Sequence, residues 1–406
     1  MKIRSGFLLP ILVLFLQGKV VAQDTIKVMW YNVLNYPDIN SARISYLQTI
    51  VQHVKPDVFV VCELTSASGA SNILNQALNV GTSSYAMVNY VNSPDDENML
   101  YYNTEKLGFV RQEEITTSLR NINEYVMYYK DPSLTSTSDT AYLYMYACHL
   151  KAGNTSQDAA ERAGETAVLR SYLNTRPYAE NTIVGGDMNI YYSSETAYQN
   201  LVGPTQANLH DPIGPGNYHA NPAFAIHHTQ STRIDQIDGG STGGMDDRFD
   251  MMLFSDDVLF GQKGVQFIPG SYRAIGQDGN HYNMALNTPV NNSEPANIIN
   301  ALYYMSDHLP IYMELLVGET VGMNESLDKF DKITLHPNPA NDILTVTTGG
   351  FGALEIALSD MMGRTLDTFK STSETTVMDV SGLSPGYYTL TLTGTNVKVV
   401  KRLMIQ

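Results

Sequence analysis

Residues 182–191 read T-I-V-G-G-D-M-N-I-Y. The run T-I-V is β-branched and apolar, which predicts a short buried strand. Gly185 and Gly186 lack side-chain bulk, so the chain can turn there and a substrate can approach the backbone. Asp187 and Asn189 point to the same side if the backbone stays extended. A carboxylate and an amide at a strand end suit a hydrated metal ion with a phosphate; the alternative is an ordinary Gly-Gly-Asp turn.

Other predicted strands in the first 317 residues also end at polar side chains. Hydrophobic patterns predict strands at residues 24–31, 58–62, 85–91, 99–102, 125–129, 141–148, 249–255 and 309–316, and helices at residues 44–54, 70–78 and 158–173. The first helix can begin at a cap formed by Asn40 or Ser41. It would join two parallel strands, so that Asn32 and Glu63 lie at the same end of adjacent strands.

Composition limits the kind of protein. The 406 residues have room for two domains, and 43 % hydrophobic with 16 % charged residues indicates a globular chain. The net charge of −16 argues against non-specific binding to nucleic acid through a basic surface. It does not exclude a nuclease, because a metal ion can neutralise phosphate locally.

The N-terminus carries a processing signal. Lys2 and Arg4 precede an apolar run that is too short to span a bilayer, and Ala22 closes the segment. This pattern predicts a signal peptide over residues 1–22, and no later segment is long and apolar enough to cross a membrane.

The two cysteines each precede a polar residue that we assign to the site. Cys62 comes before Glu63, and Cys148 comes before His149. Neighbours in a strand point to opposite faces, so the cysteines would face the core and their neighbours the site. Two buried free thiols are favoured over a disulfide.

Eight polar residues fall at or beside strand ends: Asn32, Glu63, His149, Asp187, Asn189, Asp250, Asp307 and His308. If Asp250 is buried it needs a partner, and a histidine is the natural one. The chain has no thiol-based metal motif, no P-loop and no G-x-S-x-G elbow. A set rich in oxygen ligands favours magnesium, calcium or manganese over zinc.

The order of these motifs resembles the endonuclease/exonuclease/phosphatase superfamily, which includes pancreatic-type deoxyribonucleases. The matching motifs are Asn32, Glu63, His149, Gly186-Asp187-Met188-Asn189, Arg248-Phe249-Asp250 and Ser306-Asp307-His308. The resemblance covers about residues 24–317. It implies a DNase I-like α/β four-layer sandwich, with two central β-sheets between helices, and Mg²⁺-dependent cleavage of phosphate esters (Ca²⁺ or Mn²⁺ being alternatives). The sequence departs from the family in having Cys62 before the metal glutamate and Met188 in the central motif.

The resemblance also implies a role for each residue. Glu63 would bind the metal, with Asn32 and Asp307 near it. Asp187 would orient or deprotonate the attacking water, and Asn189 would hold a phosphate oxygen. Asp250 would pair with His308, which acts as a general base or stabilises the transition state. His149 would contact the phosphate or assist the leaving group, with Asp96 or Glu97 as its nearest carboxylate candidates.

Two further residues are predicted to bind substrate, Asn98 and Arg233. Arg233 lies within residues 203–244, which are rich in Gly, Pro, Asn and His and predict an ordered loop region beside the substrate. Its forked guanidinium can hold a phosphate or a carboxylate. The alternative is that this part of the loop is tied down by internal hydrogen bonds.

The last 75 residues predict a second domain, after a polar linker at residues 319–331. Short strands with turn signals predict a small all-β sandwich over residues 332–406. Leu335-His336-Pro337-Asn338-Pro339-Ala340, Ser381-Gly382-Leu383-Ser384-Pro385-Gly386-Tyr387-Tyr388 and Lys401-Arg402-Leu403 resemble the sorting domain of Bacteroidetes type IX secretion substrates. The resemblance implies export through the periplasm by the type IX machinery. The alternative is a carbohydrate-binding or adhesive β module.

These observations predict a secreted or surface-attached metal-dependent phosphodiesterase with residues 23–318 as its catalytic domain. We expect an extracellular endonuclease acting on nucleic acid. One alternative is a phosphatase or phospholipid phosphodiesterase of the same fold, which the acidic net charge favours. The other is an inactive surface binding protein, against which the intact set of polar residues argues.

Overall fold

The structure is a computed structural model that describes residues 24–92, 97–132, 134, 140–176, 180–204, 207–318, 333–348, 351, 353–394 and 397–406. The predicted signal peptide and the predicted linker at residues 319–331 lie outside the described residues.

Two β-sheets form the centre of the first domain. In the described part of the chain, the first sheet contains β1 (Asp24–Tyr36), β2 (Val58–Leu64), β3 (Tyr85–Met87), β4 (Glu97–Asn103), β10 (Val265–Phe267), β11 (Arg273–Ala274) and β12 (Ile311–Val317). The second contains β5 (Leu107–Ile115), β6 (Ile122–Tyr129), β7 (Tyr142–His149), β8 (Thr182–Asp187) and β9 (Asp250–Phe254), in that order across the sheet.

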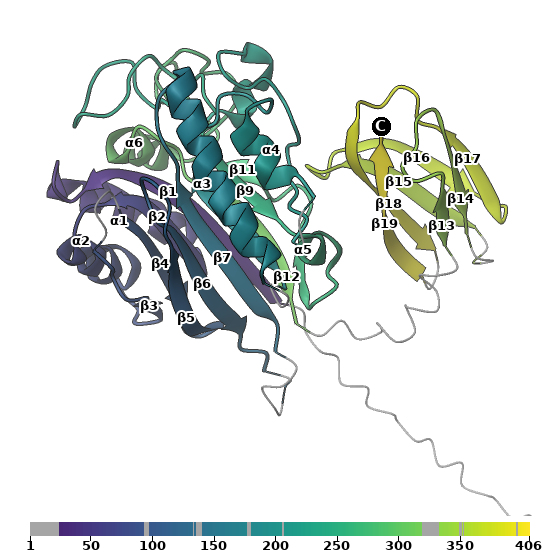
Figure 1. Cartoon of the computed structure of the whole chain (residues 1–406), viewed down its shortest axis with the longest axis horizontal. Coiled ribbons are helices and arrows are strands. Elements are labelled where there is room, and N and C mark those ends of the chain that lie inside the picture. Colours follow the sequence, from purple (N-terminus) through teal and green to yellow (C-terminus); the bar gives the residue numbers. More distant parts are fainter. Residues whose placement is uncertain are drawn as a thin grey trace, which may run out of the picture.

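Helices cover the outer faces of both sheets (Figure 1). In the described residues the α-helices are α1 (Ile44–Val54), α2 (Ala67–Asn72), which continues into the π-helix η2 (Ile73–Leu78), α3 (Ser156–Asn174), α4 (Thr196–Val202), α5 (Asp256–Phe260) and α6 (Ala296–Met305). Residues of α1 and α6 pack with the first sheet, and residues of α3 and α4 pack with the second. The expected four-layer arrangement, with two central sheets between helices, is therefore confirmed.

Strand β8 shows why the quoted stretch lies at the centre. Ile183 packs into the core shared by the two sheets, and Val184 packs against the helices on the other face. A side chain at Gly185 would come within 3.0 Å of Trp30 on β1, so the glycine makes room for the facing sheet. Strand β8 runs parallel to β7 and antiparallel to β9, which places its last residue between two neighbouring strand ends.

Most expected elements are present, with boundaries that differ by a few residues. The side chain of Asn40 caps the turn η1 (Ser41–Arg43) before α1, and β1 and β2 pair in parallel as expected. Strand β5 was not predicted; its alternation is weak because its middle is exposed and charged. The backbone is not extended beyond β8, since Asn189 has a φ of 50°. Among residues 203–244, the structure describes a 3-10 turn, η4 (Pro222–His227), and otherwise irregular chain.

The C-terminal domain is a small all-β sandwich, as expected. Its described strands are β13 (Thr334–His336), β14 (Ile343–Thr347), β15 (Leu354–Asp360), β16 (Thr365–Ser371), β17 (Thr375–Asp379), β18 (Gly386–Gly394) and β19 (Val397–Ile405). They form two antiparallel sheets around a core of their own.

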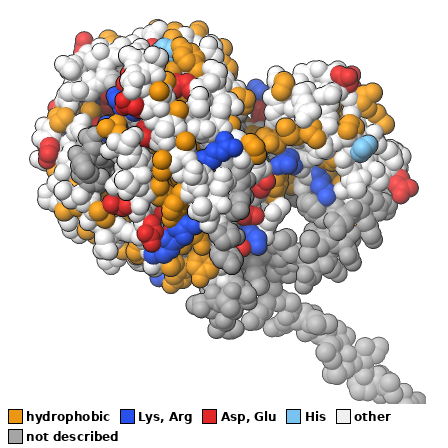
Figure 2. All heavy atoms as spheres, viewed as in Figure 1, with side chains coloured by type: hydrophobic (Ala, Val, Ile, Leu, Met, Phe, Trp, Pro, Cys, Tyr) orange, Lys and Arg blue, Asp and Glu red, His pale blue; other side chains and the backbone are white. Residues whose placement is uncertain are grey.

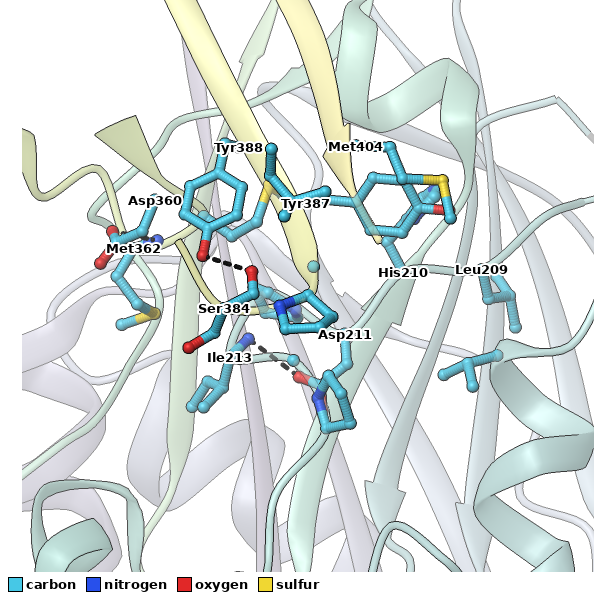
Figure 3. Close-up of a pocket in the computed structure, with 18 of the residues that line it drawn as sticks. Leu209, His210, Asp211, Ile213, Asp360, Met362, Ser384, Tyr387, Tyr388 and Met404 are labelled. Atoms are coloured by element: carbon cyan, nitrogen blue, oxygen red, sulfur yellow. Dashed lines mark hydrogen bonds between the residues drawn. The ribbon is translucent and has the colours of Figure 1, made fainter. Parts of the chain in front are cut away.

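A cleft of about 590 Å³ separates the two domains beside a set of contacts that join them. Arg402 lies 3.0 Å from the Asp256 carboxylate, and its guanidinium stacks on the rings of Phe260 and Tyr387. His210 contacts the same carboxylate oxygen of Asp256, at 2.6 Å. Figure 3 shows Tyr387, Tyr388 and Met404 of the C-terminal domain facing Leu209, His210 and Asp211 of the first domain.

Candidate active site

Strand register gathers the candidate residues at one edge of the two sheets. Across the second sheet, His149 pairs with Asp187, and Asp187 pairs with Asp250. In the first sheet, Asn32 pairs with Cys62, the residue before Glu63. The neighbouring strand ends therefore present their polar side chains to one region between the sheets.

Asn32 lies at the middle of this region. Its Nδ2 donates to Oε1 of Glu63 at 2.7 Å and to Oδ2 of Asp187 at 3.1 Å, and it lies 3.5 Å from Nε2 of His308. Its Oδ1 accepts from the backbone N–H of Leu34. Asn32 therefore holds the carboxylates of both sheets together through its amide nitrogen, rather than offering its oxygen to a metal.

Three side chains form a pocket of metal-ligating atoms. Atoms of Glu63, His149 and Asp187 all lie within 4.8 Å of one another. Nε2 of His149 is 3.6 Å from Glu63 and 3.8 Å from Asp187. Glu63 comes from the first sheet, whereas the other two come from the second.

The electrostatics of this pocket suit a divalent cation. Burial raises the pKa of Glu63 to about 7, with the Asp307 carboxylate adding to the shift, and burial raises the pKa of Asp187 to about 6. Burial also lowers the pKa of His149 well below its ordinary value, so its imidazole is neutral. A bound cation would offset the repulsion between the two ionised carboxylates, and a neutral imidazole can act as a metal ligand. A metal ion therefore fits these three residues.

Asp250 and His308 form the buried pair that the sequence predicts. Nδ1 of His308 lies 2.8 Å from Oδ2 of Asp250, and its Nε2 lies 3.6 Å from Asp187. Burial lowers the pKa of His308, but the carboxylates of Asp250, Asp187 and Asp307 outweigh it and raise that pKa well above its ordinary value. His308 is therefore a cation at neutral pH, with Asp250 fixing its orientation.

Asp307 and Asn189 lie beside the pocket but are engaged in other contacts. Oδ2 of Asp307 accepts from the backbone N–H of Ser241 at 2.7 Å, and Asp307 is outside the three-residue pocket. The backbone N–H of Asn189 donates to Asp187, and its Nδ2 donates to the carbonyl of Leu150. Asn189 thus supports Asp187 through an Asx-type turn, in place of the extended geometry expected from the sequence.

Cys148 faces away from the site, as expected from the alternation of side chains along a strand, but Cys62 does not. Cys148 packs against the helices on the outer side of its sheet, while His149 turns inward. Cys62 instead lies near the site, since burial and then the Asp187 carboxylate raise the pKa of its thiol. Glu63 has a φ of 56°, so its side chain reaches the site by a local turn of the backbone. Both thiols are free and buried, as expected.

The structure corrects the prediction that Arg233 binds substrate. Arg233 is fully buried, and its guanidinium donates to the carbonyls of Tyr303, Ile237 and Tyr304. These contacts match the alternative, in which the loop is tied down by internal hydrogen bonds.

The other predicted contacts are buried or lie outside the described residues. Asn98 is 7 % exposed, and its Nδ2 donates to Asn123 and to the carbonyl of Ala147, so it bridges the two sheets. As for the carboxylate partner expected for His149, Asp96 and the side chain of Glu97 lie outside the described part of the chain.

One site contact comes from Gln230, in the polar run at residues 227–233. The side-chain amide of Gln230 lies 2.6 Å from Nε2 of His308, and its backbone pairs with Asp247 and His308. The only signal for it was its position in a polar loop of the right composition, which does not single out one residue.

Comparisons with known proteins identify the second domain. Residues 334–406 match the secretion system C-terminal sorting domain. The C-terminal region is a sorting domain. It indicates export, to the outer surface or beyond it, and engagement with type IX secretion machinery. In the described residues, no helix has the length and apolar character needed to span a membrane.

For the first domain, the similar proteins are solved structures with low sequence identity. TDP2 of D. rerio, complexed with a single-strand DNA product, has a TM-score of 0.48 at 17 % identity and covers 72 % of this chain and 98 % of its own. The human Nocturnin catalytic domain with a bound sulfate anion has a TM-score of 0.44 at 16 % identity. The match covers 73 % of this chain and 98 % of the Nocturnin chain. An endonuclease/exonuclease/phosphatase from Bacteroides vulgatus has a TM-score of 0.45 at 12 % identity. The match covers 73 % of this chain and 100 % of that protein's chain. A search of curated proteins finds no match.

Proposed function

We propose that the protein is an exported, divalent-metal-dependent phosphodiesterase that acts on nucleic acid as an endonuclease, with Mg²⁺ as the metal. The observation that carries this proposal is the pairing of a metal-ligating pocket with a cationic histidine. Glu63, His149 and Asp187 surround one position, and His308 faces Asp187 from 3.6 Å away. A phosphate placed between them would meet opposite charge from both sides.

Each residue then has a step to perform. A divalent cation held by Glu63, Asp187 and His149 would polarise the phosphate and neutralise its charge. Asp187 would orient the attacking water and accept its proton. His308 stabilises the negative charge that develops on the phosphoryl oxygens, because its pKa keeps it protonated. Asp250 positions His308, and Asn32 holds Glu63 and Asp187 at their separation.

The division of the chain is part of the proposal. Residues 1–22 serve as a signal peptide, residues 23–318 carry catalysis, and residues 332–406 direct export after a linker at residues 319–331. A second candidate function is hydrolysis of phosphomonoesters or phospholipid head groups. It is favoured by the net charge of −16, which repels a long polyanion away from the metal.

The test uses the full mature chain with closed-circular plasmid and, in parallel, bis(p-nitrophenyl) phosphate and p-nitrophenyl phosphate. We expect nicking and diester hydrolysis that require Mg²⁺ and stop with a chelator. Asp187→Asn should lower turnover by about 10²–10⁴-fold, the usual effect of removing a general base.

Controls separate loss of chemistry from loss of folding. Asp257→Asn changes a half-buried carboxylate on α5, away from the site, and should leave turnover unchanged. Hydrolysis of the monoester alone would move the assignment to the second candidate function. Full activity of a folded Asp187→Asn variant would remove Asp187 from its role.

A further inference from the structure

An aromatic wall stands beside the candidate site and has no part in the steps described above. It consists of Tyr191, Tyr192, His219 and Phe249. The rings of Tyr191 and His219 are 4.9 Å apart, those of Tyr191 and Phe249 are 4.8 Å apart, and those of Tyr192 and His219 are 5.7 Å apart. All three pairs meet edge to face.

Backbone connections place this wall next to the reacting groups. Tyr191 follows Asp187 by four residues, and Phe249 immediately precedes Asp250. The carboxylate of Asp187 contributes to the raised pKa of Tyr191, behind burial and Asp247, so the phenol lies within electrostatic reach of the site. The wall therefore borders the position at which a phosphate would bind.

The wall is held firmly and is open to solvent at its outer end. Glu195 accepts from the backbone N–H of Tyr191 and forms an ion pair with Arg162 of α3, whose guanidinium lies over the Tyr191 ring. Tyr192 is 41 % exposed and the His219 side chain is 27 % exposed. Aromatic rings that are fixed at one end of a cluster and exposed at the other are the arrangement expected of a binding surface.

His219 adds a hydrogen-bonding group to the rings. Its Nδ1 bonds to the Asp247 carboxylate, whose main chain pairs with Gln230, the residue in contact with His308. Among the described residues, none hydrogen-bonds Nε2 of His219. That nitrogen is therefore the group through which the wall can bond the edge of a planar ligand.

We propose that the aromatic wall is a subsite that stacks an unpaired nucleobase next to the scissile phosphate. This inference rests on the proposed phosphodiesterase function and specifies its substrate as single-stranded nucleic acid. In a duplex the faces of the bases are already stacked, so only an unpaired base can present a face to Tyr192 and an edge to His219.

The charge of the protein favours stacking as the source of affinity. With a net charge of −16, the chain cannot rely on many phosphate contacts along a strand. On the face drawn in Figure 2, the blue basic side chains are few and separated, with no continuous basic track. The polar tips of tyrosine and histidine also suit a base better than an acyl chain, which needs a wholly apolar groove.

The test compares substrates with and without a base at the cleaved position. For the full mature chain with Mg²⁺, we would measure kcat/KM on a single-stranded oligonucleotide, on its duplex and on methyl p-nitrophenyl phosphate. The quantity of interest is kcat/KM for the single-stranded oligonucleotide divided by kcat/KM for methyl p-nitrophenyl phosphate. Tyr192→Ala should lower this ratio by about 10–100-fold, mainly through a higher KM for the oligonucleotide, as expected for loss of one stacked base. Tyr192→Phe keeps the ring and should restore most of the ratio.

Tyr142→Ala is the matched control, because Tyr142 is a similarly exposed tyrosine, 37 % exposed on β7, whose ring lies 6.5 Å from that of Tyr128. It should leave the ratio unchanged. An unchanged ratio in Tyr192→Ala, or faster cleavage of duplex than of single strand by the wild type, would overturn the subsite.

A separate binding measurement distinguishes this inference from the proposed function. Thymidine 5′-monophosphate would be titrated into the full chain by calorimetry without any turnover. Binding that weakens in Tyr192→Ala but not in Tyr142→Ala supports the subsite even if no phosphodiester is hydrolysed. Equal binding by both variants contradicts it, whatever the enzyme activity.

Discussion

Two aspartates of this protein each bond one nitrogen of a histidine, and the two histidines differ in what their other nitrogen contacts. Asp250 bonds Nδ1 of His308 at 2.8 Å, and Asp278 bonds Nδ1 of His281 at the same distance. The other nitrogen of His308 faces Asp187, whereas that of His281 binds the carbonyl of Pro289. Two pairs of equal geometry therefore have different surroundings, one at the site and one inside a loop.

The two pairs give a matched prediction. Asp250→Asn should lower kcat by about 10²–10⁴-fold, because the cationic form and the orientation of His308 both depend on the carboxylate. Asp278→Asn should leave kcat unchanged and lower only the melting temperature. Steady-state kinetics and thermal unfolding of both variants check this. Equal losses of kcat in the two variants would mean that the Asp250–His308 pair matters no more to turnover than the Asp278–His281 pair in the loop.

The site residues that can be predicted from the sequence are those whose side chains are unusual at the end of a buried strand. Asp187, Asp250 and His308 stand out because a charge there needs a partner, and the structure supplies those partners. Gln230 and Arg233 could not be separated in this way. Both lie in one polar loop, and only tertiary contacts decide that Gln230 faces His308 while Arg233 binds main-chain carbonyls.

Among the elements, Gly186 of β8 and Gly164 of α3 have opposite surroundings. A side chain at Gly186 would lie 1.8 Å from the carbonyl oxygen of Cys148, and its φ of +141° disfavours any other residue. A side chain at Gly164 meets nothing within 4 Å.

These environments predict opposite effects of the same substitution. Gly186→Ala should destabilise the protein by about 3 kcal/mol, since backbone must move in addition to the strained φ. Gly164→Ala should stabilise it by about 0.5–1 kcal/mol, because alanine is the better residue inside a helix. Urea unfolding midpoints at constant m-value measure both. A destabilised Gly164→Ala or an unaffected Gly186→Ala would contradict the described packing.

Elements with a clean period were predictable, and elements shaped by tertiary contacts were not. Strand β2 is an apolar run, and the helical pattern of residues 158–173 predicted α3. The capping box of Thr155 and Asp158, which begins that helix at Ser156, was not predicted. Strand β5 carries charges in its exposed middle and pairs on one side only, with β6. Its pairing comes from the neighbouring hairpin strand, which no local pattern encodes.

At the scale of the whole molecule, one arginine joins the two domains. Arg402 contacts Asp256, Phe260 and Tyr387 at the edge of the cleft. Each contact is partly exposed, so together they contribute about 1–2 kcal/mol. Arg402→Ala should therefore raise the share of open conformers about tenfold and increase the radius of gyration in X-ray scattering. Arg364→Ala, in a pair that is 77 % exposed on the arginine side, should leave the radius unchanged.

The candidate metal pocket also links distant parts of the chain, because its ligands come from both central sheets. Glu63 belongs to β2, whereas His149 and Asp187 belong to β7 and β8, so a cation would join the sheets where carboxylates otherwise repel. Magnesium at about 100 times its Kd should stabilise the folded chain by roughly 2.7 kcal/mol.

Glu63→Gln separates this stabilisation from a general salt effect. The substitution removes a buried charge, so it should raise the melting temperature without metal and abolish most of the rise that magnesium causes. Glu105→Gln, on an exposed turn, should keep the full magnesium response. The measurement is thermal unfolding of the three proteins with magnesium and with a chelator. A magnesium response in Glu63→Gln equal to that of the wild type would place the cation elsewhere.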